Sequence, residues 1–204
     1  MSEQEKNQDS ADEAKEIYTF IDGKTIALTP KNQEHIETYA RWINSEKVRM
    51  FSRNEVPRSV DEIKKWFEPK GDGPKEDIGF EIWHKEDQKL IGFGGLNNIN
   101  YFHSFANLYM EIGETEYWNQ GIATEATKLI TEYGFLELNM NKIYVEIFSP
   151  NIGSLKAAKK AGFIPEATLK QQVYVEGRYV DIERFYLLKD EWMKKNQKNI
   201  DENE

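Results

Sequence analysis

The segment YWNQGIATEA, residues 117–126, decides the fold because it joins a predicted strand to a predicted helix through a single glycine. Residues 119–121 turn the chain, and Ile122 opens a run of good helix formers. No Ser, Thr or Asp stands directly before this helix, so its first N–H groups need a partner other than a capping side chain. A helix that begins on Gly121 can receive a phosphate group, because nothing covers its N–H groups and its dipole favours an anion. A tight turn without a ligand is the alternative, and neither a P-loop nor a dinucleotide fingerprint is present.

Alternating apolar residues predict strands on both sides of this turn. These strands are residues 78–84, 89–99, 107–114 and 142–148, with an early hairpin turning at 22–23 and a late one near 176–177. Capping and periodicity predict helices that open at Thr29-Pro30, at Ser59 with Glu62 in a capping box, at Ile122 and at Asn151. Strands and helices in this order predict one mixed α/β domain without an internal linker.

Composition narrows the class of protein further. The formal charge of −9 includes a net −4 from residues 1–16, which hold six acidic and two basic residues and are expected to be a disordered acidic tail. An acidic body without a basic cluster argues against nucleic-acid binding and favours cationic partners, although such charge is also ordinary solubilising surface. The chain has no cysteine, no apolar run long enough to cross a membrane and no signal peptide. We therefore expect a cytoplasmic protein without membrane contact.

YWNQGIATEA, a strand, and then NIGSLKAAKKAGF at 151–163 together resemble the Gcn5-related N-acetyltransferase (GNAT) superfamily. Within it, YARWINSEKVRMF and GRYVDIERFYLLKDEW are similar to the branch of ribosomal-protein N-terminal acetyltransferases. The resemblance covers residues 17–192 and leaves 193–204 as a polar C-terminal tail. It implies a single-domain α/β fold with a mostly antiparallel sheet, a V-shaped splay between central strands, and about four flanking helices.

The resemblance also implies a binding site for acetyl-CoA as co-substrate. The backbone of residues 120–124 (Gln120, Gly121, Ile122, Ala123 and Thr124) would hold the pyrophosphate. Trp118 stands where the superfamily commonly has Gln or Arg, so one polar contact is absent. Asn151 matches the asparagine that touches the cofactor arm, and a backbone N–H near Ile112 would stabilise the oxyanion of the reaction. No metal is implied, and His35, His84 and His103 lie too far apart in sequence for a metal-ligand motif.

Attack of an amine on a thioester needs a neutral amine and a proton for the departing thiolate. Many superfamily members supply that proton from a tyrosine, but Ala158 stands at its position. In the branch named above a serine takes this role, which points to Ser154; a local backbone bond at the start of a helix is the alternative. The branch's basic glutamate is replaced by Val173, so Glu111 in the cleft strand is the substitute we expect, against the alternative of a solvated carboxylate.

The branch resemblance favours a protein N-terminal α-amine as acceptor, bound near residues 51–58. An α-amine has a pKa of about 7.7–8.0 and loses its proton more easily than a lysine at about 10.4. Two alternatives remain: an acetyltransferase for a polyamine or amino sugar, and a catalytically silent acyl-CoA-binding sensor or scaffold. The protein is expected to act as a monomer or a homodimer.

Overall fold

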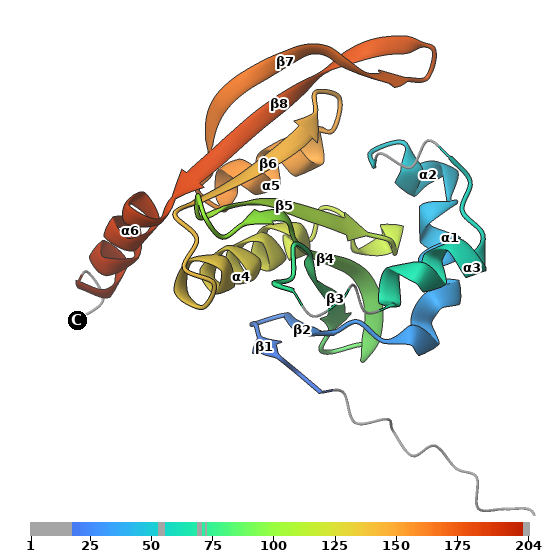
Figure 1. The fold of residues 1–204 in the computed structure, drawn as a ribbon, viewed down its shortest axis with the longest axis horizontal. Helices are drawn as coiled ribbons and strands as arrows, with labels where there is room; N and C mark the ends of the chain where they lie inside the picture. Colours follow the sequence, from blue (N-terminus) through green and yellow to red (C-terminus); the bar gives the residue numbers. More distant parts are fainter. Residues whose placement is uncertain (1–17, 53–55, 69–70, 72, 202–204) are drawn as a thin grey trace, which may run out of the picture.

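The computed structural model describes residues 18–52, 56–68, 71 and 73–201. Eight strands form one sheet in the order β1-β2-β3-β4-β5-β6-β8-β7 (Figure 1). The strands are β1 Ile21–Asp22, β2 Ile26–Pro30, β3 Ile78–His84, β4 Lys89–Asn100, β5 Phe105–Ile112, β6 Lys142–Phe148, β7 Ile164–Val175 and β8 Arg178–Leu188. The helices are α1 Ile36–Ile43, α2 Glu46–Arg49, α3 Val60–Lys64, α4 Ile122–Leu136, α5 Ile152–Lys160 and α6 Lys189–Asp201. The predicted acidic tail, residues 1–16, lies outside the described residues.

The sheet is antiparallel except where β5 meets β6. These two strands pair in parallel from Phe105 opposite Lys142 only as far as Asn107 opposite Tyr144, and then they separate. The remaining five residues of β5 and the last four of β6 therefore border an open wedge. This confirms the mixed, mostly antiparallel fold with a V-shaped splay between its central strands. The described residues form six α-helices where about four were expected.

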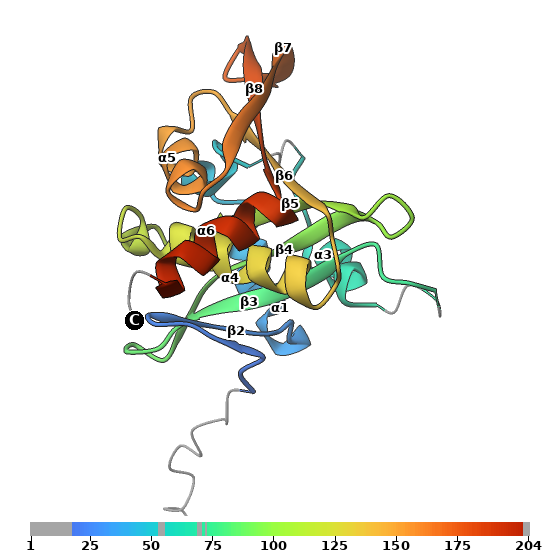
Figure 2. The ribbon, with the colours of Figure 1, turned by 90° about the vertical axis from the view of Figure 1, so that its left-hand side faces the viewer.

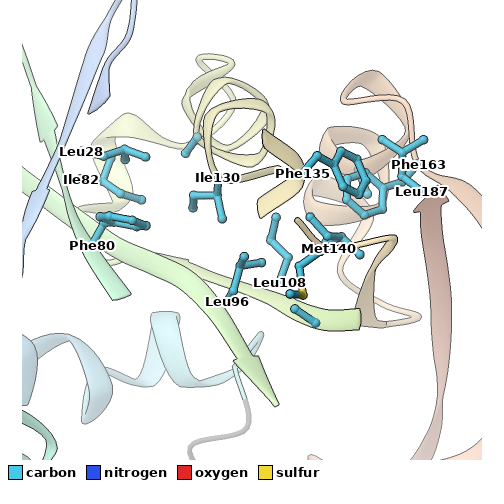
Figure 3. Close-up of a cluster of buried hydrophobic side chains, with 14 of the residues drawn as sticks. Leu28, Phe80, Ile82, Leu96, Leu108, Ile130, Phe135, Met140, Phe163 and Leu187 are labelled. Carbon is cyan, nitrogen blue, oxygen red and sulfur yellow. The ribbon is translucent and has the colours of Figure 1, made fainter. Parts of the chain in front are cut away.

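Helices cover both faces of the sheet. Figures 1 and 2 show α1, α2 and α3 on one side and α4 and α6 on the other. The larger core lies between the sheet and α4; ten of its residues are labelled in Figure 3, among them Leu96, Leu108, Ile130 and Phe135. The smaller core joins α1 to the opposite face, where Tyr39 stacks on Phe93 at 4.9 Å between ring centroids. The sheet thus has two buried faces, which we call the α4 face and the α1 face.

The start of the first helix differs from the sequence prediction. Thr29 and Pro30 were expected to open it, but they end β2, and α1 begins only at Ile36. A short 3-10 turn intervenes, capped by Asn32, whose side chain accepts from the N–H of Glu34 at 3.0 Å. Proline is tolerated here because β1 pairs with β2 only at residues 27 and 28, so β2 is an edge where Pro30 lies.

Other local predictions are confirmed. Ser59 and Glu62 form both halves of the capping box of α3. The C-terminal hairpin turns at Glu176 and Gly177, whose φ values are 47° and 80°, and it extends beyond the rest of the sheet (Figure 1). The expected polar tail from residue 193 is instead helical through Asp201, because α6 is anchored by packing of Trp192 against Phe135 at 5.7 Å.

Candidate active site

A cavity of about 1020 Å³ opens at the splay between β5 and β6. It is bordered by the N-terminus of α4, the first turns of α5, and the α1 face of the sheet. Six of the seven predicted cofactor-binding residues and both predicted catalytic residues line it; these are Glu111, Ile112, Gly121, Ile122, Ala123, Thr124, Asn151 and Ser154. Gln120 does not, because its side-chain amide is turned away and donates to the carbonyl of Glu116 at 2.6 Å.

The first turn of α4 is built as the sequence suggested. Gly121 precedes the helix in the left-handed region, with φ 86° and ψ −8°, and no side chain caps the helix. A Cβ placed on Gly121 would have no atom within 4 Å, so the space in front of these N–H groups is open. The residue type fits the geometry, because glycine adopts positive φ without strain and leaves room for a ligand at the helix dipole.

Backbone groups of β5 also face the splay. The N–H of Gly113 donates to the carbonyl of Ile91 at 2.9 Å, which makes residues 91 and 113 a hydrogen-bonded pair of β4 and β5. Such pairs alternate along antiparallel strands, so Glu111 also bonds to β4, whereas Met110 and Ile112 direct their N–H and C=O groups away from it. Beyond Asn107 no β6 residue pairs with them. The structure therefore directs the N–H groups of Met110 and Ile112 toward the splay, and Ile112 is the residue at which the sequence predicted the oxyanion donor.

Trp118 borders the cavity beside the end of β5. The sequence did not predict this position for its side chain. Its indole N–H donates to the carbonyl of Ile112 at 2.8 Å, and its ring meets that of Phe51 edge-on at 6.0 Å. Trp118 thus ties the turn before α4 both to the end of β5 and to the residues after α2. Phe51 and Ser52 line the cavity, whereas residues 53–55 of the predicted acceptor segment lie outside the described residues.

Asn151 and Ser154 occupy the start of α5. The side-chain oxygen of Asn151 caps the helix by accepting from the N–H of Ser154 at 3.1 Å. A contact between Asn151 and the cofactor arm would therefore use its amide nitrogen. Ala158, where many relatives have tyrosine, is 4% exposed and also borders the cavity, so no hydroxyl is available at that place. Val173 lies on β7 and does not line the cavity.

Charge is unevenly distributed around the cavity. Lys156 and Lys160, in the middle and at the last position of α5, line it. The carboxylates of Asp77, Glu111 and Glu146 line it on the sheet. Alternation along β5 places Glu111 on the α1 face, since its cross-strand partner Phe93 packs with α1.

Glu146 forms an ion pair across the sheet. Arg184, opposite it on β8, forms that pair with hydrogen bonds from two guanidinium nitrogens, one of them at 3.1 Å from Nε. The hydrogen bond to Glu146 also raises the pKa of Arg184.

A buried carboxylate supports the α1 side of the cavity. Glu81 is 1% exposed and accepts from the backbone N–H of Asn32 at 3.0 Å and the indole of Trp83 at 3.2 Å. His35 Nδ1 lies 2.9 Å from it, and the hydroxyl of Tyr39 donates to it at 3.4 Å. Burial, followed by the Glu81 charge, raises the pKa of Tyr39, so this cavity-lining phenol stays neutral. No sequence motif indicated this network, since its members come from two stretches, residues 32–39 and 81–83, that lie more than 40 residues apart.

No group of three or more His, Cys, Asp or Glu side chains in the described part of the chain is arranged to hold a metal ion. Among the described helices, none is both long and apolar enough to cross a membrane.

The fold and the site together define an acyl-group transferase of the GNAT type, and sequence comparison agrees. Residues 25–164 match the acetyltransferase (GNAT) domain family, which is more than half of the chain. The protein therefore belongs to the GNAT family of acetyltransferases. This confirms the superfamily that residues 117–126 and 151–163 suggested.

Individual relatives refine the comparison. The chain is 33% identical over 113 residues to the uncharacterized N-acetyltransferase p20 of Bacillus licheniformis, a match that covers 55% of this chain and 63% of that protein. It is 29% identical over 110 residues to spermidine N(1)-acetyltransferase of Vibrio cholerae, covering 54% and 63%. The chain thus matches somewhat less than two thirds of these relatives' own length. A crystal structure of spermidine N-acetyltransferase from Vibrio cholerae with CoA and spermine has a similar fold, with a TM-score of 0.75 at 23% identity, covering 84% of this chain and 99% of that one.

The branch expected from the sequence is not supported. The relative and the solved structure named above that have a stated substrate are spermidine N-acetyltransferases, not ribosomal-protein N-terminal acetyltransferases. The motifs that suggested that branch, at 39–51 and 177–192, lie at the edges of the domain or beyond the matched residues. These two short motifs were therefore not sufficient to indicate the class of acceptor.

Proposed function

We propose that this protein transfers an acetyl group from acetyl-CoA to a primary amine of a polyamine by direct attack. The observation that carries the proposal is one large cavity that is lined by an uncapped helix terminus and two lysines and also by carboxylates from the sheet side. A phosphate-bearing acyl donor suits the first end, and a cationic acceptor suits the second. GNAT family membership supports the acetyl-transfer chemistry.

The donor end has the groups that acetyl-CoA needs. The pyrophosphate would lie against the N–H groups that follow Gly121, with Lys156 and Lys160 close enough to line the same cavity. The amides of the pantetheine arm would pair with the backbone groups of β5 that face the splay, at Met110 and Ile112. This pairing substitutes for the β6 strand that is absent at this point of the sheet.

The chemical step follows from the groups around the splay. The neutral amine attacks the thioester carbon, and the carbonyl oxygen becomes an oxyanion that a β5 N–H, at Ile112 or Met110, stabilises. The C–S bond then breaks, the amine proton passes to Glu111, directly or through water, and the CoA thiolate takes a proton from Ser154. The proton held by Glu111 then returns to Ser154 through solvent, so both side chains regain their starting states. Both side chains border the cavity, and no covalent enzyme intermediate is required.

The acceptor is the point on which this proposal departs from the first expectation. A protein N-terminus was favoured because an α-amine has a low pKa and can lose its proton without a strong base. The Vibrio cholerae relative named above is a spermidine acetyltransferase by name, and the carboxylates that line the cavity match a polycation better than a peptide end. A polyamine amine resembles lysine, with a pKa of about 10.4, so removal of its proton depends more strongly on Glu111.

The test is acetyl transfer from acetyl-CoA to a panel of amines, followed as thiol release and as product mass. The panel contains spermidine, spermine, an amino sugar, lysine, and a peptide with a free N-terminus. We expect turnover of the polyamines above all others. Turnover of the free peptide alone would restore the N-terminal acceptor. Tight CoA binding without transfer to any amine would support the silent binding module instead.

A further inference from the structure

Tyr109 crosses the sheet to reach a carboxylate at the edge of the cavity. Its cross-strand neighbour is Gly95, whose own partner on β3 is Gly79, so no side chain blocks the α1 face along this row. A Cβ on Gly79 would lie 2.6 Å from the Tyr109 hydroxyl, which shows that the ring lies directly over the glycine. The hydroxyl donates to Oδ1 of Asp77 at 3.2 Å. Burial, and then the Asp77 charge, raises the pKa of Tyr109, so the phenol remains a donor.

Asn107, two residues before Tyr109 on β5, has a side-chain oxygen without a partner in the described part of the chain. Asn107 donates from its amide nitrogen to Oδ1 of Asn97 at 2.7 Å, and both residues line the cavity. The side-chain oxygen of Asn107 is buried and has no hydrogen-bond partner within the described residues. A buried acceptor of this kind is unfavourable unless a donor reaches it. The geometry therefore calls for an N–H group on the α1 face near Asn107.

The side chain of Lys31 shows that an alkylammonium group fits on the α1 face of the sheet, over Gly79. Its ammonium would lie 2.7 Å from a Cβ on Gly79, beside the Tyr109 hydroxyl, and the residue is half-buried. No ion pair of Lys31 is present among the described residues. An alkylammonium group thus already lies over Gly79 at the cavity, which the exposed Asp77 also lines.

We propose that Asp77 and Asn107 form a subsite for a second, non-reacting ammonium group of the acceptor, and that Lys31 competes for it. This proposal rests on the polyamine acceptor proposed above. Residues 107, 109 and 111 share one face of β5 in steps of about 6.8 Å, two residues of strand rise. A propyl or butyl spacer spans about one such step, and Asn107 lies two steps, about 13.6 Å, from Glu111. The reacting amine can therefore lie at Glu111 while an amine two spacers away reaches Asn107. The enzyme then selects polyamines over monoamines.

The test compares spermidine with butylamine, which carries no second ammonium. Asp77→Asn is expected to lower kcat/KM for spermidine on the order of tenfold, while butylamine changes by less than about twofold. Lys31→Met is expected to act in the opposite direction and to lower KM for spermidine, because the competing ammonium is gone. Glu76→Gln is the matched control, since it removes an exposed carboxylate next to Asp77 that does not line the cavity.

Calorimetric titration of spermidine into each variant saturated with CoA gives a readout that does not depend on turnover, and circular dichroism checks folding. If wild type acetylates spermidine but Asp77→Asn keeps the same preference over butylamine, the subsite is overturned and the proposed function stands. If Lys31→Met raises KM for spermidine, the competing role of Lys31 is overturned. A wild-type protein that acetylates monoamines but not spermidine overturns the polyamine acceptor, and the subsite with it.

Discussion

Replacing Gly121 with aspartate tests whether the N-terminus of α4 receives the pyrophosphate of acetyl-CoA. The structure predicts that the fold survives this change. A Cβ at this position meets no atom within 4 Å, so no steric clash arises. The φ of 86° is left-handed, which costs an ordinary L-residue about 1–2 kcal/mol but less for Asp or Asn. The loss in unfolding free energy should therefore stay below about 2 kcal/mol.

The effect on CoA binding should be larger. A carboxylate on residue 121 would lie about 5 Å from a phosphate charge, where two like charges repel by about 1–3 kcal/mol at an effective dielectric constant between roughly 80 and 20. At 1.4 kcal/mol per decade, this weakens CoA binding by about 5- to 150-fold for one charge pair. Because the site is partly open to solvent, added salt should reduce the effect.

Gly121→Asn is the matched control, because asparagine has the shape of aspartate and tolerates the left-handed region equally well. Calorimetric titration of CoA into both variants, at low and at high salt, separates charge from shape. We expect the asparagine variant to bind more tightly than the aspartate variant, with a gap that narrows in salt. Equal affinities of both variants and wild type would refute the placement of the phosphates at this turn. Equal losses in both variants would leave the turn as a steric border and refute the electrostatic argument.

Three further predictions concern groups around the same cavity. Ser154→Ala should lower kcat by about 10²-fold or more with little change in KM if its hydroxyl protonates the thiolate; an unchanged kcat would leave Ser154 a helix residue only. Glu111→Gln should lower turnover of spermidine most at mildly acidic pH, where more of the amine is protonated; superimposable pH–rate profiles would assign proton removal to water or another group. Burial raises the pKa of Tyr39 and Tyr109, so their neutral forms add stability below about pH 10 that is lost as the pH rises above it. Phenolate absorbance should therefore show two tyrosines that ionise only when the chain unfolds, and early, reversible titration of all ten would contradict this.

The sequence predicted the local structure at the starts of α4 and α5 because its signals there are local. Gly121 at the start of α4 and Asn151 at the cap of α5 each depend on the few residues that follow them. Both ends of strand β6, residues 142–148, were predicted correctly. The alternating pattern stops just before Pro150 and before Asn151, which caps the next helix. The first helix was misplaced for the opposite reason: whether Pro30 ends a strand or opens a helix depends on the distant β3 strand that pairs with it.

The acceptor half could not be predicted in this way. The contact between Tyr109 and Asp77 exists only because two glycines, one on β4 and one on β3, lie in register with the tyrosine. Nothing in the spacing of these residues along the chain reveals that alignment. The same is true of the four donors that converge on Glu81. An acceptor class that depends on such long-range neighbours is not encoded in short motifs, which explains why the flanking motifs indicated the wrong branch.

Strand β5 explains how one site can handle two chemically different substrates. Its even-numbered residues direct their amides into the splay, where the acyl donor would bind, and its odd-numbered residues direct side chains onto the α1 face, where a cation would bind. A shift of one residue in register would exchange these roles, so the end of β5 must be fixed. It is held by Gly113, whose Cβ would lie 2.0 Å from the ring of Trp42, and by Glu114, which accepts from Trp42 at 2.7 Å and Lys89 at 2.9 Å. The buried contact between α1 and β5 thereby sets the position of the reacting groups on both sides of the strand.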